Sequence, residues 1–136
     1  MSNEVAVVRR FVEEYQSTGN EEVALELLAP DFVDRCPFGP FPPTREGVLG
    51  LFQMLRAGLP DLHAEIHDQL VEGDKVVTRK TFRGTHRGEL LGIAPTDREV
   101  AWDVIDIVRV RDGLMVEHWN VVDAYGLMAQ LGAIPS

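Results

Sequence analysis

Cysteine, basic residues and long apolar runs are all scarce in this sequence of 136 residues. The single cysteine, Cys36, excludes an internal disulfide, and no Cys-x-x-Cys pair is present to hold a structural zinc ion. No uncharged run reaches the roughly 18 residues of a membrane-spanning helix. We therefore expect a protein of a reducing compartment that folds without covalent or metal cross-links.

Positive charge is outweighed by negative charge, since 13 Lys and Arg stand against 22 Asp and Glu, for a formal net charge of −9. The resulting field repels phosphate backbones and anionic lipid headgroups, which argues against nucleic acid and membrane surfaces as partners. The opening residues Met1-Ser2-Asn3-Glu4 lack the basic and apolar regions of a signal peptide. These features predict a cytoplasmic protein.

Several well-known catalytic motifs are also missing. No serine lies in a Gly-x-Ser-x-Gly elbow, and neither a P-loop nor a Gly-x-Gly-x-x-Gly motif occurs. The segment His63-Ala64-Glu65-Ile66-His67 has the histidine spacing of a zinc-binding helix, but its alternating pattern indicates a strand. We therefore expect neither a metal site nor a bound cofactor.

Apolar residues in the first half of the chain recur at helical spacing. Residues 5–19 carry them three and four positions apart, which predicts a first helix. Asn20 can cap a second, short helix that Pro30 ends. Thr44 can cap a third helix that ends at Gly58.

After Pro60 the apolar period changes from 3.6 to 2, which is typical of strands. The alternation predicts four antiparallel strands, at residues 62–71, 75–85, 99–110 and 114–122. A last short helix is expected at residues 125–131. Helices followed by a run of antiparallel strands describe an α+β fold with helices on one face of a curved sheet. We expect residues 1–136 to form one domain.

The turn Asp112-Gly113 allows two registers for the last hairpin. A two-residue loop pairs Arg111 with Leu114, whereas a three-residue loop pairs Val110 with Leu114. We favour the three-residue loop because it gathers the polar residues of the two strands on one face.

The favoured register has two consequences. Asp106 lies opposite His118, and Asn120 lies opposite Val104, so that Trp102 shares one face with the three polar residues. The other face is expected to carry apolar residues, namely Ile105, Ile107, Met115, Trp119 and Val121. Because the helices can cover only one face, a second copy of the sheet should cover the other, which predicts a homodimer or a larger even assembly.

Two stretches of the chain carry a family pattern. They are residues 84–98, which contain Gly84-Thr85-His86-Arg87-Gly88-Glu89, and residues 112–132, which contain Glu117-His118-Trp119-Asn120-Val121-Val122-Asp123. Together with the helical N-terminal third, they resemble the SnoaL-like polyketide cyclases of the NTF2-like superfamily over residues 5–132. The resemblance implies an NTF2-like cone, in which a curved antiparallel sheet and three N-terminal helices enclose a pocket.

The resemblance also implies a cofactor-free intramolecular aldol cyclisation of a polyketide ester. In that chemistry a base removes a proton from an activated carbon, and hydrogen-bond donors stabilise the enolate. The acid/base aspartate of the family corresponds here to Asn120, whose amide cannot take up a proton at neutral pH. We therefore expect His118, oriented by Asp106, to act as the base, and Asn120 to donate to the enolate.

Three further residues are candidates for contact with a small apolar or aromatic ligand. Tyr15 and Asp34 match positions that line the pocket in the family, and Trp102 offers a flat apolar wall. Tyr15 also lies on an apolar helix stripe, so core packing is an alternative role for it. Two other functions stay open: a module that binds a small molecule without turning it over, and an epoxide hydrolase or ketosteroid-isomerase-like enzyme that uses Asp106 as its carboxylate.

Overall fold

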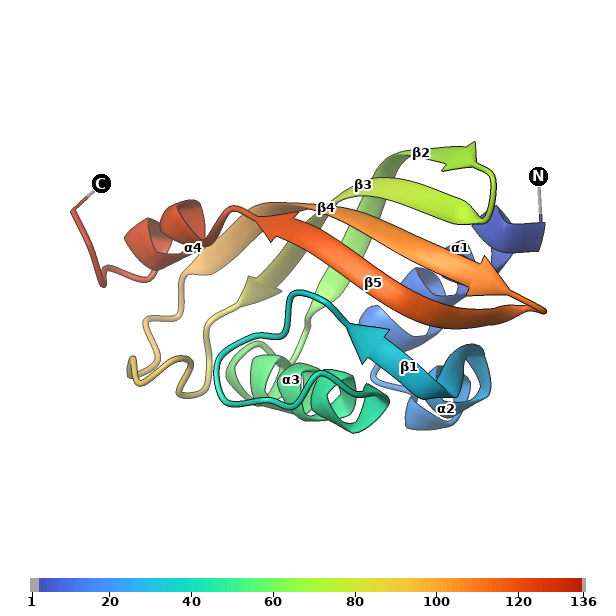
Figure 1. The fold of residues 1–136 in the computed structure, drawn as a ribbon. Helices are drawn as coiled ribbons and strands as arrows, with labels where there is room; N and C mark the ends of the chain where they lie inside the picture. Colours follow the sequence, from blue (N-terminus) through green and yellow to red (C-terminus); the bar gives the residue numbers. More distant parts are fainter. Residues whose placement is uncertain (1–2, 136) are drawn as a thin grey trace.

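The computed structural model describes residues 3–135, which form a curved five-stranded sheet with helices on its inner face (Figure 1). Met1, Ser2 and Ser136, at the two ends of the expected domain, lie outside the described residues. The predicted α+β fold class is confirmed, with the helical segments first and the meander of strands after them.

Four helical segments precede the meander. They are α1 (Asn3–Phe11), the π-helical segment η1 (Val12–Gln16), α2 (Glu21–Leu27) and α3 (Arg45–Gly58). Asn20 and Thr44 cap α2 and α3 as predicted, each with a side-chain oxygen that accepts a backbone N–H of the first turn. In the part of the chain that the structure describes, no helix is long and apolar enough to cross a membrane.

The sheet has the strand order β1-β5-β4-β3-β2. Its strands are β1 (Leu28–Asp34), β2 (His63–Glu72), β3 (Lys75–Thr85), β4 (Glu99–Arg111) and β5 (Leu114–Val122). The last helix, α4 (Ala124–Gln130), follows β5. The four strands of the meander match the prediction, but β1 was not predicted. Pro30, expected to end a helix, instead lies within β1. An edge strand tolerates proline because one side of it makes no ladder hydrogen bonds.

The turn between β4 and β5 corrects the predicted register. Arg111 pairs with Leu114 across the two-residue loop, so the favoured three-residue loop is wrong. Asp112 and Gly113 both have positive φ, at 52° and 78°. This backbone geometry belongs to the two-residue hairpin turns whose twist matches that of the flanking strands.

A β-bulge in β5 then shifts the pairing by one further residue. Asp106 consequently lies opposite Asn120, and His118 lies opposite Val108, whereas Asp106 had been expected opposite His118. The net error is two residues, and side chains alternate between faces with a period of two. Trp102, Asp106, His118 and Asn120 therefore still share the inner face, where they line one cavity.

The same bulge explains a misplaced methionine. Met115 was expected on the outer face, but it is 3% exposed, pairs with Val110 and lines the inner cavity. Because Met115 precedes the extra residue of the bulge, its side chain points opposite to the direction expected from the alternation farther along β5. Ile105 and Val121, by contrast, are exposed at 46% and 75%.

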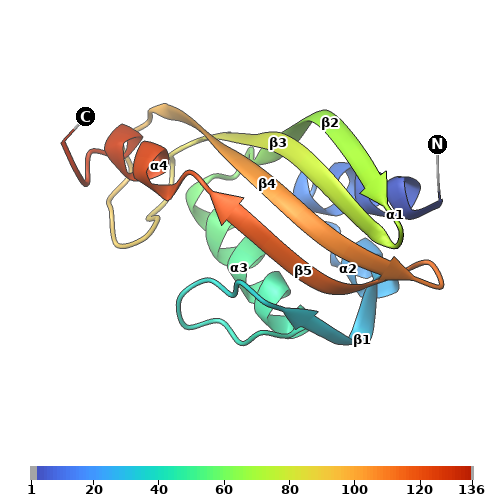
Figure 2. The ribbon, with the colours of Figure 1, turned by 45° about the horizontal axis from the view of Figure 1, so that its top comes forward.

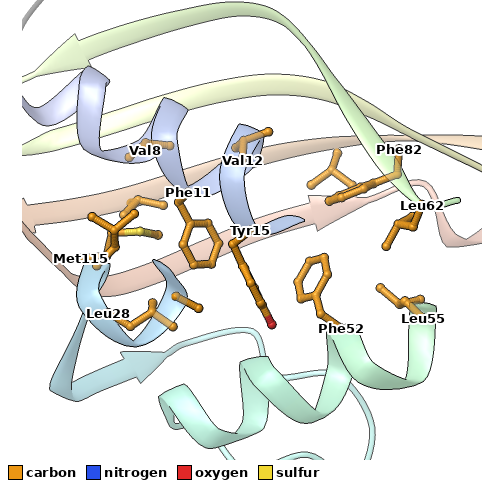
Figure 3. Packing of buried hydrophobic residues seen from close by; sticks show 14 of the residues in the cluster. Val8, Phe11, Val12, Tyr15, Leu28, Phe52, Leu55, Leu62, Phe82 and Met115 are labelled. Atoms are coloured by element: carbon orange, nitrogen blue, oxygen red, sulfur yellow. The ribbon is translucent and has the colours of Figure 1, made fainter. Parts of the chain in front are cut away.

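Helices α1, α2 and α3 pack against one face of the sheet and leave the other face uncovered within residues 3–135 (Figures 1 and 2). A chain of aromatic contacts runs through this core, with successive ring centroids 5.1 to 5.9 Å apart. The rings in order are those of Phe11, Tyr15, Phe52, Phe82 and Trp102. Figure 3 labels the first four of them. The aromatic chain connects the helices to the inner face of β3 and β4.

Candidate functional site

A cavity of about 420 Å³ lies between the inner face of the sheet and the helices. Its wall is mostly apolar and aromatic, a lining typical of small-molecule sites of this size. A few polar side chains also reach it, among them Gln16, Asp34, Lys80, Asp106, His118 and Asn120.

The alternation of side chains along three neighbouring strands aims most of these groups inward. Lys80 lies on β3, Asp106 on β4, and His118 and Asn120 on β5. Asp34 comes from the end of β1, where the parallel pairing with β5 places it beside His118. Each of these side chains thus depends on sheet register for its position.

The imidazole of His118 lies between two carboxylates. Its Nδ1 is 3.0 Å from Oδ1 of Asp34, and its Nε2 is 2.6 Å from Oδ1 of Asp106. Burial alone lowers the pKa of His118, but the hydrogen bonds and charges of Asp106 and Asp34 outweigh it and raise the pKa to about 9. At neutral pH the ring is an imidazolium that donates one N–H to each carboxylate.

Asp106 contacts a second cation through its other oxygen. Its Oδ2 lies 2.6 Å from Nζ of Lys80, which also donates a hydrogen bond of 2.7 Å to Oε1 of Gln16. Burial raises the pKa of Asp106, but the Lys80 ammonium and His118 together lower it to about 2. Two carboxylates and two cations therefore form a charge-balanced network, the arrangement that buried ions require.

These contacts change the role expected for His118. The structure brings His118 and Asp106 together, but both ring nitrogens of His118 face carboxylates. A ring with a pKa of about 9 also keeps its proton at neutral pH. An imidazolium has no lone pair that can accept a proton, so the role of His118 as the base stays a prediction that requires loss of its ring proton.

Asn120 and Trp102 both lie at the cavity wall. Within residues 3–135, no hydrogen bond occupies the side-chain amide of Asn120, so its N–H groups are available to a ligand. The Trp102 ring stacks on Phe82, with centroids 5.3 Å apart and ring planes 24° apart. Trp102 thus provides a flat, rigid wall.

Tyr15 lies away from this polar network. Its side chain is 1% exposed, sits between Phe11 and Phe52, and is not part of the cavity wall (Figure 3). No hydrogen bond reaches its hydroxyl within the described residues, and burial raises its pKa. This position is that of a core residue, which was the alternative role for Tyr15.

Lys80 and Gln16 are two residues of the cavity wall that were not predicted from the sequence. Lys80 falls on the inward alternation of β3, between buried Thr78 and Phe82, and a lone charge in such a pattern is a usable signal. Gln16 carries no comparable signal, because the π-helical η1 departs from the 3.6-residue period that a sequence pattern tests.

No group of three or more His, Cys, Asp or Glu side chains is placed to hold a metal ion within residues 3–135. The two histidines with zinc-like spacing lie on β2, as the alternation indicated. Nδ1 of His63 contacts the Asp61 carbonyl oxygen, and Nε2 of His67 contacts Oγ1 of Thr81. Nδ1 of His67 also lies 4.0 Å from Oε1 of Glu65, so the two rings do not converge on a shared site.

Residues 6–131 match the family model described as SnoaL-like polyketide cyclase. The aklanonic acid methyl ester cyclase DnrD of Streptomyces peucetius is 30% identical, over 97% of this chain and 92% of that protein.

Two solved structures share the fold over nearly the whole chain. IdmH of Streptomyces antibioticus, a candidate polyketide cyclase, has a TM-score of 0.85 and 37% identity, over 96% of this chain and 99% of its own. AclR of Streptomyces galilaeus, a candidate hydroxylase, has a TM-score of 0.89 and 27% identity, over 100% of this chain and 85% of its own.

Proposed function

Because the chain belongs to the SnoaL-like polyketide cyclase family, we propose that it catalyses an intramolecular aldol cyclisation of a mid-sized, largely apolar polyketide ester. The observation that carries this proposal is the charge-balanced polar network of Asp34, His118, Asp106 and Lys80, set in the wall of an apolar cavity. A cavity that only held an apolar ligand would gain nothing from burying four charges, each of which is costly to desolvate.

The chemistry begins with loss of a proton from an activated carbon, which leaves an enolate. The enolate oxygen needs a hydrogen-bond donor, and the unoccupied amide of Asn120 supplies one at the cavity wall. The His118 imidazolium adds positive charge to the same wall. Since His118 already carries its proton at neutral pH, the proton acceptor is a carboxylate.

We also propose that the enzyme is cytoplasmic and independent of cofactors. Enolisation followed by aldol addition moves one proton and forms one carbon–carbon bond, so its balance requires no oxidant or reductant. The small apolar ligand would bind against Trp102 and Phe82, whose stacked rings suit a flat ring system. The single cysteine fits a reducing compartment.

Incubation of the purified protein with aklanonic acid methyl ester tests the proposed reaction. An intramolecular aldol cyclisation conserves mass, so we expect a product of equal mass and changed retention in liquid chromatography coupled to mass spectrometry. Asn120→Ala should lower kcat by roughly 10²- to 10³-fold, because it removes an enolate donor.

Two comparisons complete this test. Asn120→Asp restores the aspartate of the family. Its kcat, compared with that of Asn120→Ala, shows whether a carboxylate at this position supports the reaction after the amide donor is lost. If neither the wild type nor Asn120→Asp turns over any polyketide ester, but calorimetry shows that the wild type binds ring compounds, the binding module is the correct function.

The outer face of the sheet provides a second proposal, that two copies of this chain associate through it. Exposed Ile105 and Val121 would otherwise meet water. We expect a dimer or larger even assembly in light scattering at micromolar concentration, and dissociation on Val121→Glu. Leu25→Glu is the matched control, because Leu25 is also exposed but lies on α2, on the helix side. A monomeric wild type would contradict the proposal.

A further inference from the structure

Two carboxylates reach the cavity, and they differ in how their oxygens are occupied. Asp106 has no free oxygen, since Oδ1 accepts from Nε2 of His118 at 2.6 Å and Oδ2 lies 2.6 Å from Nζ of Lys80. Contact with two cations makes this carboxylate a poor proton acceptor, which agrees with its pKa of about 2. Asp106 therefore stays ionised at neutral pH.

Asp34 is held by only one of its oxygens. Its Oδ1 accepts the backbone N–H of Cys36 at 2.9 Å and faces Nδ1 of His118 at 3.0 Å. Within residues 3–135, no hydrogen bond reaches Oδ2 of Asp34, although the residue lines the cavity. The two contacts on Oδ1 hold that oxygen in place and leave the second oxygen available.

The backbone around Asp34 is also firmly positioned. Its N–H donates to the carbonyl oxygen of Pro43 at 3.0 Å, and the next N–H, that of Arg35, donates to the carbonyl oxygen of His118 at 2.8 Å. Asp34 thus belongs to a paired strand rather than to a free loop, and pre-positioned groups of this kind are what catalysis requires.

We propose that Asp34 is the catalytic base of this cavity, with Oδ2 as the proton acceptor; the assignment rests on the proposed cyclase function. The C–H bond of the activated carbon breaks, its electron pair becomes the enolate, and the proton forms an O–H bond on Oδ2. The enolate carbon then attacks a ketone carbonyl of the same molecule and forms a C–C bond. The resulting alkoxide takes the proton from Oδ2, so Asp34 is regenerated and no co-reactant is consumed.

This assignment accounts for the amide at position 120. With the base on β1 and the enolate donor on β5, a second carboxylate at position 120 is not needed. The His118 imidazolium donates one N–H to each carboxylate, so it orients Asp34, while Asp106, which is itself paired with Lys80, holds His118. A carboxylate is a sufficient base when donors stabilise the enolate.

Exchange of the substrate α-proton with deuterated solvent, measured alongside cyclisation, tests the assignment. Asp34→Asn should lower both the exchange rate and kcat by roughly 10²- to 10⁴-fold while KM changes little, because a base acts in the chemical step. Asp34→Glu, which keeps the carboxylate, should recover part of the lost rate. Asp31→Asn is the matched control, since Asp31 is an exposed aspartate of the same strand, and it should behave as the wild type.

A second measurement uses the wild type alone and so does not depend on the folding of a variant. If Asp34 is the base, kcat/KM should fall above about pH 9, where His118 loses the proton that holds Asp34. If kcat/KM instead rises tenfold per pH unit up to about pH 9, neutral His118 is the base and the assignment is wrong.

The remaining outcomes separate this proposal from the proposed function. If the wild type cyclises the ester but Asp34→Asn keeps kcat and shows only a raised KM, Asp34 is a binding residue, and the cyclase function stands without it. If the wild type neither cyclises the ester nor exchanges its α-proton, the cyclase function and the assignment of Asp34 both fall.

Discussion

Replacement of Lys80 by methionine is expected to lower the free energy of unfolding by about 3–5 kcal/mol at neutral pH. Nζ of Lys80 lies 2.6 Å from Oδ2 of Asp106, and the two side chains are only 3% and 7% exposed. Methionine preserves much of the apolar volume but removes one of the two cations that contact Asp106. It also removes the donor that Oε1 of Gln16 accepts from. Chemical denaturation at pH 7 measures the difference.

The loss should depend on pH in a defined direction. The folded-state pKa of Asp106 is lowered from 3.8 to about 2, so its stabilisation is present above pH 3.8 and lost as the pH falls through about 2. Without Lys80, the pKa of Asp106 rises. The difference in stability between the wild type and Lys80→Met should therefore shrink as the pH is lowered.

Two further variants control this prediction. Lys75→Met changes the other lysine of β3, which is half-buried and lies over the Trp119 ring, and it should cost less than about 1 kcal/mol. The double variant Lys80→Met/Asp106→Leu should lose less stability than the sum of the two single changes, because it removes both charges of the pair. A loss below about 1 kcal/mol for Lys80→Met itself would contradict the importance of this ion pair.

His118 is expected to titrate near pH 9 in the wild type, and roughly one pH unit or more lower in Asp106→Asn. Burial favours the neutral ring, so removal of one of the two opposing carboxylates shifts the balance toward it. NMR of the histidine ring protons measures both values, and His118→Gln assigns the signal among the four histidines. A wild-type value near 6.5 would contradict the double hydrogen bond.

The same shift makes stability depend on pH. The pKa of His118 is raised from 6.5 to about 9 on folding, so its stabilisation is fully present below pH 6.5 and is lost as the pH rises through about 9. The loss across this range is roughly 3 kcal/mol from this group. Asp106→Asn should flatten the curve between these pH values. His63→Gln, a change at an exposed histidine of β2, should leave its shape unchanged.

In the last hairpin, the sequence predicted which site residues share a face but not the pairing register. The loop length was predicted wrongly, yet the face shared by Trp102, Asp106, His118 and Asn120 was right. Side chains of a strand alternate between its two faces with a period of two. The wrong loop and the bulge together displaced the register by two residues, so the predicted face did not change. Met115 lies between the turn and the bulge, where the register differs from the predicted one by only one residue, so its predicted face was wrong.

Strand β1 could not be predicted from the sequence. Leu28 and Pro30 look like the end of a helix, and nothing local indicates a strand at this edge of the sheet. Asp34, at the end of β1, meets His118, which lies 84 residues later in the chain. Pairing across such a separation depends on the completed sheet rather than on local propensity.

Hydrophobic periodicity and strand alternation are local properties, so the α+β fold class and the shared inward face of Asp106, His118 and Asn120 could be predicted from the sequence. The contact of Lys80 with Asp106, the contact of Asp34 with His118 and the raised pKa of His118 became evident only in the folded structure. Protonation depends on burial and on distances between charged groups from different strands, and neither quantity exists until the sheet has formed.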